Sequence, residues 1–222
     1  WWLNESLKKL ELSLKKKFDL DLIVYKGNAQ ESLNKLIKKY KINKVIWNRL
    51  YSKNSIDRDT KIKKSLIEKK IEVETFNAHL LNEPWEIQNN SGHYFKVFTP
   101  YWKNAFEKFK EKKYQISNLK IIKPLPHQEK TKWNFLPPKK WYEKFSKYWI
   151  PGEEAALSKL ENYIINHIDN YKESRDRPDL DQTSKLSPHL RFGEISPRMI
   201  VNKAMKSKKI NISTLTFLSE IG

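Results

Sequence analysis

The chain has 222 residues, a formal net charge of +18 at pH 7 and no cysteine, which excludes disulfide bonds and thiolate metal sites. Hydrophobic residues make up 38% and aromatic residues 13% of the sequence, so a disordered basic tail is also excluded. No apolar run has the length of a membrane span and the N-terminus, WWLNESLKKL, is unlike a signal peptide, so we expect a cytoplasmic protein with no membrane partner. The charge suits a polyanion such as DNA, although scattered lysines equally indicate a solvated surface.

The first third of the chain alternates helical and strand patterns. Residues 1–18 predict an amphipathic helix whose stripe contains Leu3, Leu7, Leu10 and Leu14. Short apolar runs at 21–25, 44–48 and 71–76 have the length of buried strands. The intervening helices are predicted to bury one apolar face each, formed by Leu33, Leu36, Ile37 and Tyr40 in the first and by Ile62 and Leu66 in the second. This alternation predicts a parallel sheet with helices packed over it, and because such a domain normally begins with a strand we expect further sequence before Trp1.

Prolines interrupt this pattern between about residues 83 and 148, where we expect a long connection with one short helix around Trp102–Lys110. A regular helix is predicted again over 151–171, with Pro151 at its start. Its apolar face contains Leu157, Leu160, Ile164, Ile168 and Tyr171. A helical domain is therefore predicted to begin here. Ser187 and Ser196 each precede a proline, so each is predicted to cap the start of a further helix.

Arginine is concentrated in one segment of this lysine-rich chain. Four of the six arginines lie in RDRPDLDQTSKLSPHLRFGEISPR, residues 175–198. The planar guanidinium can bind a phosphate through two hydrogen bonds, and the alternative is an internal pair with Asp176, Asp179 or Glu194. In the same segment Thr183, Ser184 and Ser187 precede a predicted helix, where hydroxyls either help to bind an anion or act as ordinary caps.

The histidines do not indicate a metal site. None has the spacing of a metal ligand set, so each is predicted to be a surface or packed residue: His79, His93, His127, His167 and His189. No Ser-His-Asp arrangement or paired carboxylate site is evident, so the sequence does not indicate a hydrolase.

Several motifs together are similar to those of one family. They are WWLNESL, WNRLY, EPW, VFTPYWK, PGE, the segment 175–198 and FLSEIG. In this respect the chain resembles a class I DNA photolyase of the cryptochrome/photolyase family almost from end to end. The resemblance implies a truncated α/β parallel-sheet (Rossmann-like) antenna domain over 1–82, a linker over 83–150, and the start of an all-α FAD-binding domain over 151–222. By the same resemblance, both domains would be incomplete.

The resemblance also implies binding residues. It assigns Thr183, Ser184, Lys185, Leu186 and Ser187 to the loop that binds the phosphates of FAD, Tyr171 to a flavin contact and Arg175 to a contact with the DNA backbone. For Arg177, Arg191 and Arg198 we expect internal ion pairs.

Asn54 matches a residue of the family's antenna site, where methenyltetrahydrofolate binds in some members. Ser55 stands where folate binders tend to carry an acid. A deazaflavin antenna and the absence of any antenna are therefore equally compatible with the sequence. Considered alone, Asn54 is explained as well by a turn.

The activity that the resemblance implies is light-driven repair of cyclobutane pyrimidine dimers, in which reduced FAD transfers an electron to a dimer flipped out of damaged DNA. We expect a monomeric lyase. A cryptochrome photoreceptor, a (6-4) photolyase and a non-enzymatic basic DNA-binding module are the alternatives. In the family, FLSEIG continues into most of the flavin pocket, so residues 1–222 alone are expected to be inactive, and no catalytic residue is assigned within them.

Overall fold

The computed structural model describes residues 1–111, 133–207 and 210–222. Their contacts divide them into two compact units. The helical unit consists of Trp1–Leu22 and the described residues after His79 except Trp133, and the strand unit consists of Ile23–His79 together with Trp133. The N-terminal helix thus belongs with the later helices by its contacts, whereas the domain boundaries given above stay a prediction. Within the described ranges, no helix is both long enough and apolar enough to cross a membrane.

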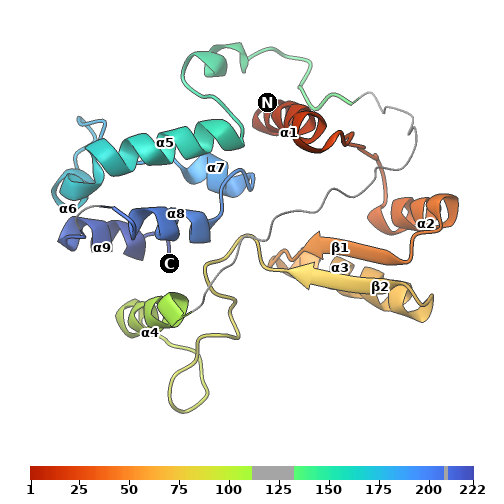
Figure 1. The fold of residues 1–222 in the computed structure, drawn as a ribbon, viewed down its shortest axis with the longest axis horizontal. Coiled ribbons are helices and arrows are strands. Elements are labelled where there is room, and N and C mark those ends of the chain that lie inside the picture. Colours follow the sequence, from red (N-terminus) through yellow and green to blue (C-terminus); the bar gives the residue numbers. More distant parts are fainter. Residues whose placement is uncertain (112–132, 208–209) are drawn as a thin grey trace. The chain divides into compact units, whose positions relative to one another are not determined.

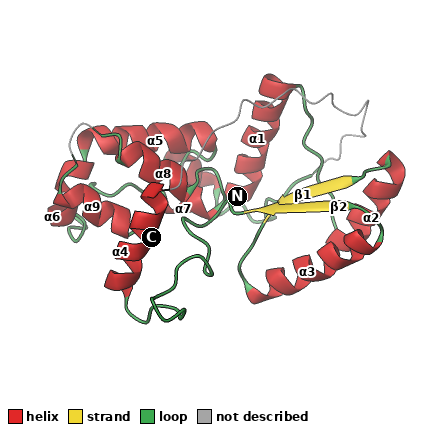
Figure 2. Ribbon diagram, turned by 60° about the horizontal axis from the view of Figure 1, so that its bottom comes forward, coloured by secondary structure: helices red, strands yellow, loops and turns green. Residues whose placement is uncertain are grey.

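The strand unit contains two parallel strands and two helices (Figure 1). Its elements are α2 (Ala29–Tyr40), β1 (Lys44–Asn48), α3 (Lys53–Glu68) and β2 (Glu72–Phe76). The strands pair from Lys44 opposite Glu72 to Asn48 opposite Phe76, and α3 lies along them (Figure 2). The predicted parallel pairing, the bounds of β1 and the burial of Ile62 and Leu66 on α3 are confirmed. Strand β2 begins one residue later than predicted, at Glu72.

Two expectations for this unit are wrong. Residues 21–25 do not form a strand, because a strand requires a neighbour for its backbone hydrogen bonds and, in the part of the chain that the structure describes, β1 pairs only with β2. The apolar residues of α2 are half-buried rather than buried. The helix is fixed at its start by Asn28, whose side chain accepts hydrogen bonds from the backbone of Gln30 and Glu31.

The helical unit contains the remaining elements. These are α1 (Trp2–Phe18), α4 (Phe98–Glu111), the short 3₁₀ helices η1 (Glu143–Lys147) and η2 (Ile168–Asn170), α5 (Glu153–Asn166), α6 (Tyr171–Ser174), α7 (Ser187–Arg191), α8 (Pro197–Ala204) and α9 (Ile212–Ser219). In Figure 1, α8 and α9 lie beside α5. The core between them consists of fully or almost fully buried apolar side chains, among them Ala156, Leu160, Ile168, Ile200, Val201, Ala204, Phe217 and Leu218.

The predicted helix over 151–171 is interrupted at His167. There the backbone leaves the helical conformation, and the chain continues as η2 and α6. The His167 ring contacts Gln182 Oε1 at 3.0 Å, so a residue outside the helix stabilises the break. In contrast, α4 is longer than expected because Pro100 lies in its first turn, where a proline removes no helical hydrogen bond.

The leucine stripe predicted for α1 is not buried. Leu3 and Leu10 are 41% and 45% exposed, whereas the residue of α1 that is buried is Asn4. The Asn4 side chain accepts a hydrogen bond from the backbone N–H of Phe135 at 3.1 Å, which satisfies a polar group inside the unit. The helix therefore packs through its first turn rather than through its leucines.

Two helices end in an unusual backbone conformation. The residues that follow α1 and α2 are Asp19 and Lys41, and both have a φ of 52°, in the left-handed region. Their N–H groups bond to carbonyls of the last helical turn. Glycine is the usual residue at such a position because it has no Cβ to clash.

Candidate functional site

The loop 183–187 presents hydrogen-bond donors at the start of α7. Thr183 and Ser187 are exposed and Ser184 is half-buried, while Leu186 anchors the loop in the core. Within the described residues, none of the three hydroxyls makes a hydrogen bond, and α7 begins without a side-chain cap. Uncapped amides and free hydroxyls are suitable donors for an anion. The donor set therefore fits a phosphate group.

The helix start differs by one residue from the prediction. Leu186 is the N-cap of α7 and Ser187 is its first helical residue, so Ser187 does not cap the helix. The prediction for Ser196 is confirmed, since its hydroxyl accepts a hydrogen bond from the backbone of Met199 at 3.2 Å. Lys185 has a φ of 49° and its ammonium lies 2.6 Å from Asp181, which fixes the direction of its side chain.

Tyr171 is the first residue of α6 and packs among aromatic rings. The ring of Phe217 approaches it edge-on, with centroids 5.4 Å apart, and Tyr163 does so at 6.4 Å. The guanidinium carbon of Arg175 lies 5.5 Å from the centre of the Tyr171 ring, within the range of a cation–π interaction. Burial raises the pKa of the Tyr171 hydroxyl, so this residue is a neutral phenol at physiological pH.

A short series of contacts connects Tyr171 to the loop. Gln182, the residue before the loop, contacts the His167 ring, and Tyr163 stacks on that ring with centroids 6.1 Å apart. Tyr163 in turn contacts Tyr171. Tyr171 is thus linked to the residue before the loop through Tyr163 and His167, which the sequence did not assign to the site.

Arg175 forms an ion pair inside the unit. Its guanidinium donates to Glu220 and lies 3.6 Å from Asp176. This is the arrangement expected as the alternative to a phosphate contact. Part of the side chain remains exposed, so a phosphate could reach it by replacing Glu220 as its partner.

The pairing predicted for the other arginines holds for Arg177 and fails for Arg191. Arg177 donates two hydrogen bonds to Asp179, at 2.9 Å and 2.6 Å, and this interaction lowers the pKa of the Asp179 carboxyl. Arg191 is exposed and pairs with no carboxylate of the described residues. Its charge is available to an external partner.

Asn54 lies in the strand unit, in the first turn of α3, and its side chain is exposed. It is therefore a helical residue, and the explanation of Asn54 as a turn residue is wrong. The adjacent Ser55, which stands where folate binders tend to carry an acid, accepts a hydrogen bond from Ser52 at 2.8 Å. A role for Asn54 in binding an antenna stays a prediction.

The structure reveals a buried carboxylate that sequence reasoning considered only as an arginine partner. Glu194 Oε2 accepts a hydrogen bond from His189 Nδ1 at 2.5 Å, with both side chains almost completely buried. Its other oxygen accepts from the Gly152 backbone at 2.7 Å and from Trp2 Nε1 at 3.0 Å. We call Trp2, Gly152, His189 and Glu194 the Glu194 junction.

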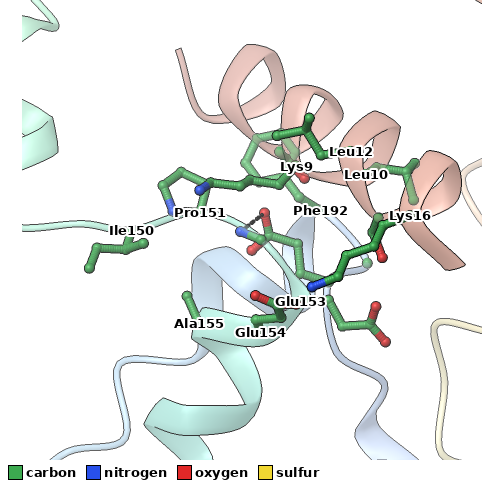
Figure 3. Close-up of a pocket in the computed structure, with 15 residues that line it drawn as sticks. Lys9, Leu10, Leu12, Lys16, Ile150, Pro151, Glu153, Glu154, Ala155 and Phe192 are labelled. Atoms are coloured by element: carbon green, nitrogen blue, oxygen red, sulfur yellow. Dashed lines mark hydrogen bonds between the residues drawn. The ribbon is translucent and has the colours of Figure 1, made fainter. Parts of the chain in front are cut away.

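A cavity of about 480 Å³ lies beside the junction (Figure 3). It is lined by α1 and by the start of α5, with Lys9 and Lys16 on one side and Glu153 and Glu154 on the other. The walls combine both signs of charge with exposed apolar side chains. In the described ranges, no group of three or more potential metal ligands is found.

These features define a class of protein, namely one with a parallel α/β unit and a helical unit that carries a loop of hydroxyl and amide donors at the start of a helix. The model of the DNA photolyase family matches residues 1–125, and the chain belongs to that family.

Named relatives agree with this assignment. The chain is 38% identical over 205 residues to a deoxyribodipyrimidine photo-lyase of Agrobacterium fabrum, in a match that covers 90% of the chain and 42% of the relative. It is 30% identical to Cryptochrome-2 of Arabidopsis thaliana, covering 90% of the chain and 34% of the relative. The crystal structure of a bacterial class III photolyase from Agrobacterium tumefaciens matches all of the chain and 47% of its own, with a TM-score of 0.88 and 32% identity. The chain spans less than half of the length of each.

Proposed function

We propose that residues 1–222 form part of a DNA photolyase, a lyase that reverses cyclobutane pyrimidine dimers in damaged DNA with light. The observation that carries the proposal is the loop 183–187, in which the free hydroxyls of Thr183, Ser184 and Ser187 precede an uncapped helix. This loop lies where the resemblance assigns the flavin phosphates. The sequence similarity to a protein named deoxyribodipyrimidine photo-lyase supports the same activity.

The cofactor of this activity is FAD. When bound and reduced, it supplies the light absorption and the electron that splits the dimer. The three hydroxyls of the loop would donate hydrogen bonds to its phosphates, Leu186 and Lys185 would hold the loop in place, and Tyr171 would contact the flavin as a neutral aromatic residue. If the protein has an antenna, methenyltetrahydrofolate or a deazaflavin would bind near Asn54, and a protein without an antenna is the alternative.

The partner is damaged DNA, and the protein acts as a cytoplasmic monomer. Arg175 contacts the DNA backbone, exchanging its carboxylate partner Glu220 for a phosphate. The net charge of +18 supports binding to a polyanion. We assign the protein to class I by its motifs, and the structural likeness to a class III photolyase makes that class the competing assignment.

A cryptochrome photoreceptor is the second candidate, because the chain is also 30% identical to Cryptochrome-2. Blue-light illumination of the protein that carries these residues, with reductant and dimer-containing DNA, separates the two. Loss of dimers supports the photolyase. Flavin absorbance without dimer loss would support the photoreceptor, and a protein that binds DNA without any flavin would be a non-enzymatic binding module.

The loop assignment is tested by replacing Thr183 and Ser184 together by Val. Each hydroxyl lost from a charged partner weakens binding, so we expect FAD affinity to fall by about tenfold or more. Flavin absorbance of the purified protein is the measurement. Thr60→Val, an exposed position on α3, is the matched control and should retain FAD. Full FAD occupancy in the double variant would return these hydroxyls to an ordinary role at the start of a helix.

A further inference from the structure

We propose that Glu194 is a positioning residue, whose ionised carboxylate holds the N-terminal helix and the start of α5 against the helix that follows the loop 183–187. The four residues of the Glu194 junction come from separate parts of the sequence, and Trp2 and Glu194 are 192 positions apart. A single side chain therefore connects α1, α5 and α7.

The carboxylate is saturated with donors. One oxygen accepts from His189 and the other from Trp2 and the Gly152 backbone, and the Ser6 hydroxyl donates as well. A carboxylate only accepts hydrogen bonds, so His189 carries a proton on Nδ1. Burial alone would raise the pKa of Glu194, but the hydrogen bonds from His189, Ser6 and Gly152 outweigh it and lower the pKa. The geometry thus favours the charged form.

The backbone at Gly152 gives independent evidence for close packing at this point. Its φ is 113°, which is a conformation that residues with a side chain rarely adopt. A Cβ there would meet the Cβ and Cγ of Lys9 at 3.2 Å. Helix α1 and the start of α5 are therefore in contact without space for a methyl group, and the Gly152 N–H points to Glu194.

Aromatic contacts surround the charged group. The Trp2 ring packs edge-on against His189 at 5.1 Å and Trp149 at 5.6 Å, and it stacks on Phe192 at 6.1 Å. These rings exclude water from one side of the carboxylate, which strengthens its hydrogen bonds. Glu194 lines the cavity together with four other charged residues, Lys9 and Lys16 of α1 and Glu153 and Glu154 of α5. Figure 3 shows the side chains of these four residues.

The junction acts on the loop through His189. This residue lies two positions after Ser187 in α7, and both its side chain and its backbone carbonyl bind Glu194. Loss of the carboxylate charge would release α1 and allow α7 and the loop before it to move. The expectation that this movement weakens flavin binding rests on the proposed function. The attachment of α1 by Glu194 does not depend on it.

The test uses Glu194→Gln in the 222-residue chain, because the amide has nearly the same shape but no charge and adds donors where only acceptors fit. We expect a Tm about 10 °C lower at pH 7 and backbone amides of α1 that exchange hydrogen at least tenfold faster. The control is Glu161→Gln, whose exposed carboxylate pairs with Lys203 and whose loss should leave both measurements unchanged.

The pH dependence separates the charge from mere packing. Because the pKa of Glu194 is lowered in the folded state, its stabilising contribution is present above the ordinary carboxyl pKa of about 4.3 and is lost as pH falls through the lower folded value. The difference in Tm between the wild type and Glu194→Gln should therefore shrink below about pH 4. A difference that stays constant down to pH 2 would overturn the role of the charge.

Trp2→Phe provides a second variant if Glu194→Gln does not fold. It keeps an aromatic ring and removes one donor, so α1 amides should exchange about tenfold faster. Unchanged α1 exchange in both variants would overturn the proposal. The effect on the loop is measured in the longer protein that carries these residues. If Glu194→Gln keeps full FAD occupancy there although α1 is released, the effect on the loop is overturned. If that protein binds no FAD even without a substitution, while α1 is released in the variants, the attachment of α1 is supported and the proposed flavin site fails.

Discussion

The two units of this chain are stabilised in different ways. The helical unit has a core of completely buried apolar side chains contributed by α5, α8 and α9. In the strand unit, Ile62 and Leu66 are the buried apolar residues, and Ile46 and Phe76 are 55% and 50% exposed. Helices become stable mainly by packing an apolar face, whereas the paired strands also have a backbone ladder and the ion pairs of Lys44 with Glu72 and Glu74.

The two units differ in how many faces of their helices and strands pack against other parts of the same unit. Alternation along β1 places Val45 and Trp47 on the more buried face and Ile46 on the other. Large apolar residues on the exposed face, such as Ile46 and Phe76, gain little from folding in this arrangement. The helical unit should therefore be the more sensitive of the two to loss of a single buried side chain.

The largest expected effect comes from truncating one buried leucine in each unit. Leu160 is 0% and Leu66 is 2% exposed. Leu160→Ala should lower the free energy of unfolding of the helical unit by about 4 kcal/mol, because its tightly packed neighbours leave a cavity. Leu66→Ala should cost the strand unit about 2 kcal/mol, because its half-exposed surroundings can collapse or admit water.

Native-state hydrogen exchange, measured on peptides from each unit, gives these free energies separately. Ile165→Ala, at an exposed position of α5, is the control and should change neither. Equal losses for the two leucines would contradict the comparison.

An intermediate effect is expected from two glycines with positive φ. Gly152 and Gly27 have φ values of 113° and 124°, so Ala is strained at both, at a cost of about 1–2 kcal/mol. Only at Gly152 does the new Cβ also meet a neighbour, the side chain of Lys9. Gly152→Ala should therefore cost about 1 kcal/mol more than Gly27→Ala. Thermal unfolding of the two variants measures the difference, and identical Tm values would mean that Lys9 moves aside freely.

The smallest effect is expected at two helix caps. Asn211 caps α9 by accepting from the backbone of Thr214 at 2.9 Å, and its amide also donates to Asp169. Asn28 caps α2 and contacts only its own helix. Asn211→Ala should cost about 1.5 kcal/mol and Asn28→Ala about 1 kcal/mol. Denaturant titration followed by hydrogen exchange should show each loss of stability in the unit that contains the substituted residue. A larger loss of stability for Asn28→Ala than for Asn211→Ala would contradict the prediction.

Sequence patterns located elements whose stability depends on local features. Hydrophobic periodicity and residue type were sufficient to predict three features. These are the bounds of β1, the burial of Ile62 on α3 and the cap at Ser196. The break at His167 could not be predicted, because its contact with Gln182 depends on how the following segment folds back. The burial within α1 could not be predicted for the same reason. The leucine spacing correctly indicated a helix, but the buried residue is Asn4, whose partner Phe135 lies far along the chain.

The candidate site shows the same limit. The hydroxyls of the loop 183–187 could be selected because helix starts and hydroxyls are visible in the sequence. Glu194 could not be assigned correctly, because its donors Trp2 and Gly152 lie far away along the chain. The sequence contained one indication of this role. Glu194 is the lone acid in an otherwise apolar and basic stretch and follows His189 by five residues, but the sequence did not show that the two side chains are partners.

The left-handed residues that end α1 and α2 show where the stability of this chain can be raised. Asp19 and Lys41 occupy positions where glycine would relieve a steric cost of about 1 kcal/mol each. Both side chains are exposed, so exchanging either for glycine would leave the buried side chains of its unit in place. Each helix end is therefore a position at which one substitution adds stability without changing the loop 183–187 or the Glu194 junction.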